Sequence, residues 1–134
     1  MTKQEKQLLL KDLCGRIPYR PIITLYGDGR DKCLLCGVDG EELYLNIDSA
    51  PFSFSDFNMK PYLRPMSNMT EEEKKEHDFY CGYKPYDENI GESYLTEYDM
   101  PDYIDFLYEH HLDFRGLIEK GLALEAPRDM YKTE

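Results

Sequence analysis

Residues 20–48, RPIITLYGDGRDKCLLCGVDGEELYLNID, decide the fold class because their apolar and polar side chains alternate with a period of two. β-Branched and aromatic residues fill the stretch, and glycine-containing turns interrupt it at residues 27–29 and 39–40. This pattern is typical of short strands joined by tight turns. It predicts a three-stranded antiparallel meander.

The Asp39-Gly40 pair predicts a two-residue hairpin loop, because both positions of such a loop need positive φ and these residues tolerate it. The loop would place three pairs of residues opposite each other: Val38 and Glu41, Cys36 and Leu43, and Leu34 and Leu45. One face of the sheet would then carry Leu34, Cys36, Leu43, Leu45 and Ile47. We expect that face to pack on the first helix.

Helix starts flank the meander on both sides. Thr2 with Glu5, and Thr70 with Glu73, have the spacing of a capping box, and the second box opens a helix over residues 71–79. The first helix would end at Gly15 and Pro18 and would bury a stripe made of Leu9, Leu10, Leu13, Cys14 and Ile17.

A third helix is predicted to start around Asp99, Pro101 and Asp102. Its inner side would carry Tyr103, Phe106, Leu107 and His110, and its outer side Asp102, Asp105 and Glu109. Residues 49–69 contain three prolines and predict an ordered loop or short helical turns, and residues 82–97 predict a loop. Together the patterns predict an α+β single domain over residues 1–134, with three or four short helices packed on the meander.

Negative charge is concentrated in one part of the chain. The net charge is −11, and residues 71–109 hold 13 acidic and 3 basic residues, whereas residues 1–50 hold 8 and 7. Direct binding to nucleic acid is therefore disfavoured. The acidic segment also contains seven of the twelve tyrosines, which are Tyr80, Tyr83, Tyr86, Tyr94, Tyr98, Tyr103 and Tyr108.

Clustered carboxylates attract basic partners, and tyrosine supplies contact area at a small cost in entropy. We therefore predict a surface that binds a basic protein and imitates the phosphates of a nucleic acid. The candidate contact residues are Tyr80, Tyr83, Tyr86, Tyr94, Tyr98, Asp87, Glu88, Glu92 and Glu97. The alternative is that the charges are merely solvated and the tyrosines belong to the core.

The amino-terminal residues predict a cytoplasmic chain that does not enter a membrane. Residues 1–7 are polar, and the apolar run that follows them, residues 8–10, is far shorter than a signal peptide or a spanning helix needs. We expect the four cysteines to be thiols in such a compartment.

Cys33 and Cys36 have the spacing of half a zinc site, and His77 and Cys81 would complete a set of four ligands. A zinc-dependent nucleic-acid adaptor is therefore one alternative function. On a strand, however, Cys33 and Cys36 face opposite sides of the sheet. We accordingly expect no metal and no other cofactor.

The sequence His110-His111-Leu112-Asp113 leaves an enzyme of unrecognised type as a second alternative, since imidazole titrates near neutral pH and a carboxylate can fix its tautomer. Adjacent histidines on a helix point about 100 degrees apart, and the end of a helix favours histidine for structural reasons. No catalytic residue is therefore assigned.

Three strings carry a resemblance: LLLKDLCGRIPY (residues 8–19), KPYLRPMSNMTEEE (60–73) and HHLDFRGLIEKGLALEAP (110–127). They resemble small uncharacterised proteins of gut Bacteroides, their prophages and related phages. The paired cysteines at positions 33 and 36 do not belong to that pattern. The resemblance brings no activity with it and implies an accessory protein of a phage or mobile element that binds a host component.

Overall fold

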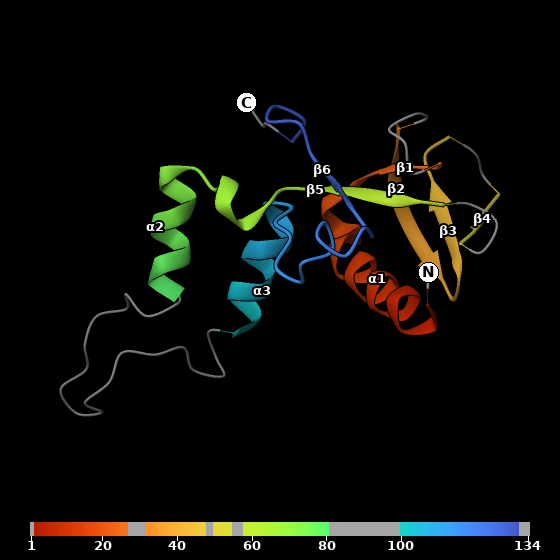
Figure 1. Ribbon diagram of the computed structural model, residues 1–134, viewed down its shortest axis with the longest axis horizontal. Coiled ribbons are helices and arrows are strands. Elements are labelled where there is room, and N and C mark those ends of the chain that lie inside the picture. The colour runs from red at the N-terminus through yellow and green to blue at the C-terminus, as the bar shows by residue number, and fades with distance from the viewer. Residues whose placement is uncertain (1, 27–31, 48–49, 55–57, 81–99, 132–134) are drawn as a thin grey trace.

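The computed structural model describes residues 2–26, 32–47, 50–54, 58–80 and 100–131, which form an α+β fold (Figure 1). The helices are α1 (Lys3–Arg16), α2 (Glu71–Tyr80) and α3 (Met100–Glu109), with short 3₁₀ helices η1 (Ile17–Tyr19) and η2 (Met66–Asn68). The strands are β1 (Ile22–Thr24), β2 (Lys32–Asp39), β3 (Glu42–Leu45), β4 (Phe52–Ser53), β5 (Lys60–Leu63) and β6 (Leu124–Glu125). The predicted fold class is confirmed.

The sheet is larger than the predicted meander. Its strand order is β4-β3-β2-β1-β5-β6, and the neighbours are antiparallel except for the parallel pair β5 and β6. The prediction of three strands was therefore wrong, although β1, β2 and β3 do form a meander. Residues 49–69, predicted as a loop or helical turns, supply β4 and β5. Pro61 lies inside β5, opposite Ile23 of β1, at a position where proline is normally disfavoured.

The β2–β3 hairpin has a different register from the one predicted. Asp39 pairs with Glu42, so the loop residues are Gly40 and Glu41, and Gly40 has a φ of +61°. The register then shifts between Leu35 and Gly37, which leaves Cys36 as the extra residue of a β-bulge. As a result Cys33 and Leu35 are buried, whereas Leu34 is only half-buried and Cys36 and Ile47 are exposed. The predicted inner face was therefore wrong on β2 and correct for Leu43 and Leu45 on β3.

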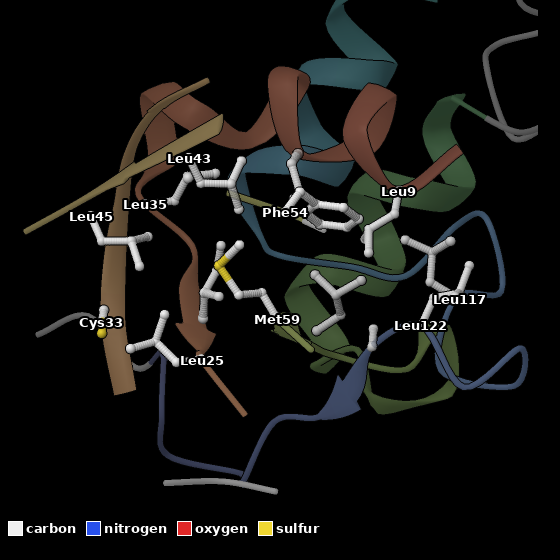
Figure 2. Close-up of a cluster of buried hydrophobic side chains, with 14 residues drawn as sticks. Leu9, Leu25, Cys33, Leu35, Leu43, Leu45, Phe54, Met59, Leu117 and Leu122 are labelled. Atoms are coloured by element: carbon white, nitrogen blue, oxygen red, sulfur yellow. The ribbon is translucent and has the colours of Figure 1, made fainter. Parts of the chain in front are cut away.

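The main hydrophobic core lies between α1 and the sheet, where Leu9 meets side chains from the strands and from the loop before β6 (Figure 2). Leu9 and Leu13 of the predicted stripe are buried, but Cys14 is exposed. The buried members of the main hydrophobic core are Leu9, Leu13, Ile23, Leu25, Cys33, Leu35, Leu43, Leu45, Phe54, Met59, Leu63, Leu117, Leu122 and Ala123.

Both capping boxes are confirmed. The backbone N–H of Glu5 donates to Thr2 Oγ1 at 3.1 Å, and the N–H of Thr2 donates to Glu5 Oε1 at 2.8 Å. Thr70 and Glu73 repeat the arrangement with the same two distances. The helix starts at both places are therefore fixed by local sequence.

Gly15 was predicted to end the first helix. The prediction was wrong, because Gly15 lies inside α1. A Cβ built on Gly15 would lie 2.3 Å from Cζ and 2.5 Å from Cε2 of Tyr108. The glycine therefore lets the backbone of α1 approach the buried ring of Tyr108, a residue of α3. This contact joins α1 to α3.

A second apolar cluster lies under α3. Phe106, Leu107 and Leu112 are its buried members, with Met66, Met69, Tyr103, Ile104 and Phe114 packed against them. Figure 1 shows α3 between α1 and α2, with α2 standing farthest from the sheet. Among the described residues, no helix has the length and apolar character that crossing a membrane requires.

Candidate functional site

The predicted contact residues lie almost entirely outside the described part of the chain. Tyr83, Tyr86, Tyr94, Tyr98, Asp87, Glu88, Glu92 and Glu97 all fall within residues 81–99. Tyr80 is the last residue of α2. The described parts of the acidic segment are therefore the two helices that flank these residues.

The outer sides of α2 and α3 carry exposed carboxylates. Asp102, Asp105 and Glu109 recur along α3 and are exposed, as the sequence predicts. On α2 the carboxylates of Glu71, Glu72 and Glu76 are exposed, and Glu71 is 3.5 Å from Lys74 Nζ. In total α2 and α3 contain eight acidic residues and two lysines.

Tyr103 and Tyr108 of α3 do not add to that surface. Tyr108 is buried, and its hydroxyl accepts a hydrogen bond from Arg115 Nη2 at 2.9 Å. Tyr103 is half-buried, and its hydroxyl lies 3.0 Å from His77 Nε2. For these two rings the core interpretation is correct.

Tyr19 lies beside the acidic surface instead. Partial burial and then the charges of Asp105 and Glu109 raise the pKa of its phenol. Tyr19 belongs to η1, the short helix directly after α1. This short helix therefore places an aromatic ring next to the exposed carboxylates of α3. Sequence reasoning missed this residue because it lies far from α3 in the chain.

A buried ion pair connects α1 to the C-terminal third of the chain. Asp12 and Arg16 are both fully buried, and Arg16 Nε donates to Asp12 Oδ2 at 2.6 Å. Arg16 Nη2 also donates to the backbone carbonyl of Leu112 at 2.7 Å, and Arg115 Nε donates to Asp12 Oδ1 at 3.1 Å. The spacing of Asp12 and Arg16, four residues apart on a helix, could have indicated the pair.

A second cluster joins β5 to α2. Arg64 binds Glu73 through two hydrogen bonds of 2.7 Å each, and it also donates to the carbonyls of His110 and Asn68. The bidentate contact with Arg64 is the largest cause that lowers the pKa of Glu73 to about 2. His110 Nδ1 lies 2.8 Å from the same carboxylate. Glu73 therefore serves both as a cap and as the counter-charge of Arg64.

His111 is buried in a positively charged environment. Its backbone is left-handed, with a φ of +57°, and its ring stacks on Tyr131 at 3.6 Å between centroids. Burial, followed by the charges of Arg16 and Arg64, lowers the pKa of His111 to about 4. His111 Nδ1 and Arg16 Nη1 are buried polar atoms with no hydrogen-bond partner among the described residues.

We expect stability to rise with pH between about 4 and 6.5 because of His111. Over this range an unfolded chain, with the ordinary pKa of 6.5, takes up a proton that the folded chain does not. Acid therefore favours unfolding, and the histidine accounts for up to about 3 kcal/mol. Urea denaturation at half-unit pH steps measures the slope.

His111→Asn is the matched control, because asparagine tolerates a left-handed backbone and does not titrate. The variant should lose the slope between pH 4 and 6.5. It should keep the loss of stability between pH 4.5 and 2 that protonation of Glu73 causes, since that carboxyl has a lowered pKa in the folded chain. An unchanged slope between pH 4 and 6.5 would contradict the assignment to His111.

The residues of the zinc hypothesis are not brought together. Cys33 is in the core, Cys36 is exposed on the bulge of β2, and His77 of α2 contacts Tyr103 of α3. Cys81 lies outside the described residues. Within the described ranges no group of three or more histidine, cysteine or acidic side chains could hold a metal ion.

The described residues form two pockets that the histidines of the enzyme hypothesis do not line. A pocket of about 270 Å³ lies between Glu5 and Leu9 of α1 and Lys120, and a shallower one of about 500 Å³ lies between Asn68 and Arg128. Neither lining includes His110 or His111. Asp113 does not orient a histidine but accepts hydrogen bonds from the backbone of Leu117 and Ile118.

The comparisons with known proteins supply no relative: no family model, no curated protein and no solved structure matches the chain.

Proposed function

We propose that this chain is a small accessory protein, encoded by a phage or mobile element, that binds a basic host protein in the cytoplasm through the acidic segment 71–109. The observation that carries the proposal is the concentration of charge, with 13 acidic and 3 basic residues in this segment. The exposed carboxylates of α2 and α3 support it, because they face solvent on the two helices that flank the predicted contact residues.

The proposed partner is a protein that binds nucleic acid. Carboxylates spaced along a helix face present negative charge much as backbone phosphates do, and complementary charge steers a basic groove onto such a face. Tyr19 adds an aromatic ring beside Asp105 and Glu109. The resemblance to phage and prophage proteins also supports a host target of this kind.

Reversal of charge on the acidic face is expected to abolish binding. The triple change Glu76→Lys, Asp105→Lys and Glu109→Lys alters exposed residues only and spares Glu73, which holds Arg64. Capture from a lysate of Bacteroides cells, at low and then at high salt, compares the variant with the unaltered protein. We expect a basic protein that the unaltered chain retains at low salt, releases as salt rises, and loses entirely on charge reversal.

The matched control is Asp39→Lys, Glu42→Lys and Glu125→Lys, which makes the same change in net charge at exposed residues of β2, β3 and β6. It should capture the same protein as the unaltered chain. In a competition assay, this chain should also displace duplex DNA from the captured protein. Equal capture by both triple variants, or capture that is indifferent to salt, would refute the proposal.

A further inference from the structure

The hydrogen bonds that the C-terminal segment after β6 makes with other described parts of the protein come from one side chain. Residues 127–129 are exposed, and the N–H of Met130 bonds within the segment, to the carbonyl of Pro127. Within the described chain, the hydrogen bonds that join residues 127–131 to other segments are both made by the hydroxyl of Tyr131. Residues 127–131, which we call the strap, are therefore anchored by Tyr131 (Figure 1, beyond β6).

The Tyr131 hydroxyl connects two neighbouring strands. It accepts from the N–H of Ile22 at 2.8 Å and donates to the carbonyl of Tyr62 at 2.7 Å. Ile22 and Tyr62 lie one residue beyond Ile23 and Pro61, which are paired between β1 and β5. Because a phenol both donates and accepts, one hydroxyl binds an amide of β1 and a carbonyl of β5 at the same time.

The ring of Tyr131 stacks on a histidine that has an unsatisfied buried nitrogen. It stacks on His111 with an interplanar angle of 12°, and burial raises the pKa of the Tyr131 phenol. His111 is 9% exposed and Arg16 is fully buried, and His111 Nδ1 and Arg16 Nη1 have no hydrogen-bond partner among the described residues. Native interiors leave few such atoms, and those that occur are commonly associated with function or with a bound molecule.

We infer that Tyr131 occupies a binding site for a phenol, and that a free phenol or a tyrosine of another chain enters this site when the strap lifts. The site consists of the Ile22 amide and the Tyr62 carbonyl, which recognise the hydroxyl, and of the His111 ring, which stacks on the aromatic ring. Main-chain groups make the polar contacts, so recognition depends on the phenol and not on the chain that carries it. The site is separate from the acidic face of α2 and α3.

The test uses the full-length Tyr131→Ala variant with p-cresol as the probe. We expect p-cresol to bind with a dissociation constant of roughly 1 mM, to raise the melting temperature, and to shift the NMR signals of the Ile22 amide and the His111 ring. Toluene has the ring without the hydroxyl and should bind about 10-fold more weakly. In the unaltered protein and in Tyr131→Phe a tethered ring competes for the site, so both should bind p-cresol at least about 10-fold more weakly than Tyr131→Ala does.

N-acetyltyrosinamide distinguishes the two sources of the phenol. Binding at a strength similar to that of p-cresol would assign the site to tyrosines of polypeptides, and binding of p-cresol alone would assign it to small phenols. A folded Tyr131→Ala variant that binds neither compound, or that binds toluene as well as p-cresol, would overturn the inference.

A second measurement requires no variant. Native-state hydrogen exchange compares the Ile22 amide with the Leu35 amide, which donates to the carbonyl of Pro21 next to Ile22. If the strap lifts by itself, the Ile22 amide should exchange at least about 10-fold faster than the Leu35 amide. Equal rates would mean that Tyr131 leaves only when the sheet unfolds, and the site would then be closed to any ligand.

Discussion

Replacement of Asp12 with alanine is expected to lower the free energy of unfolding by about 3–5 kcal/mol, because it leaves the buried guanidinium of Arg16 without its counter-charge. Both side chains are fully buried, and two hydrogen bonds of 2.6 and 3.2 Å join them. Arg115 also loses its contact with Asp12, but its side chain reaches solvent. Urea denaturation at pH 7 measures the change.

Two controls separate the buried pair from a general effect of removing a carboxylate. Asp105→Ala removes an exposed aspartate from α3 and should change stability by less than about 0.5 kcal/mol. The double variant Asp12→Leu with Arg16→Met replaces the pair with apolar side chains and should recover most of the loss. A loss below about 1 kcal/mol for Asp12→Ala would show that the pair contributes little.

Gly15→Ala is expected to destabilise the fold by at least about 3 kcal/mol, although alanine is the better helix former by about 1 kcal/mol. The new methyl group would lie 2.3 Å from a ring carbon of Tyr108. The ring cannot move aside freely, because Arg115 binds its hydroxyl, Arg16 lies 5.2 Å from its centre, and Phe114 packs edge-on against it. Thermal and urea denaturation measure the effect.

The control for Gly15→Ala is Gly37→Ala, where the nearest atoms, those of Tyr44, are 3.8 Å from the added Cβ. That variant should be neutral to within about 0.5 kcal/mol. The combination of Gly15→Ala with Tyr108→Ala should be less damaging than the two separate losses added together, since removing the ring removes the overlap. Simple additivity of the two losses would contradict the proposed contact.

Local patterns predicted the helices well. The capping boxes at Thr2 and Thr70 place the starts of α1 and α2, and the apolar spacing after Pro101 places α3, because each signal acts within one or two turns. The prediction failed at Gly15, which was expected to end a helix. Its actual role is set by Tyr108, a residue that no local pattern connects to it.

The sheet was harder to predict because its extent depends on partners distant in sequence. β5 contains Pro61 and β6 is two residues long, so neither shows the alternation of an ordinary strand. The bulge at Cys36 is equally invisible in the sequence, and it changes which side chains of β2 face the core. The extra residue of the bulge therefore exchanged the two faces of β2 before Cys36, although the face predicted for Leu43 and Leu45 of β3 was correct.

The candidate site was predicted only in part. The exposed carboxylates of α3 were correctly assigned to its outer side, whereas Tyr103 and Tyr108 turn inward. Tyr19 and Tyr131 were missed because their neighbours belong to distant segments: Asp105 and Glu109 for Tyr19, and Ile22 and His111 for Tyr131. Composition located the charge, but only tertiary structure shows which aromatic rings lie beside it.

The parallel pairing of β5 with β6 sets a condition on how the protein matures during translation. Residues 124–125 must leave the ribosome before β6 can pair with β5. Tyr131 must also leave it before the Ile22 amide gains its hydroxyl partner. Until then the nascent polypeptide exposes the open edge of β5, and such edges are prone to aggregation. Termination of translation before residue 124 would therefore leave a fragment that is prone to aggregation through the open edge of β5.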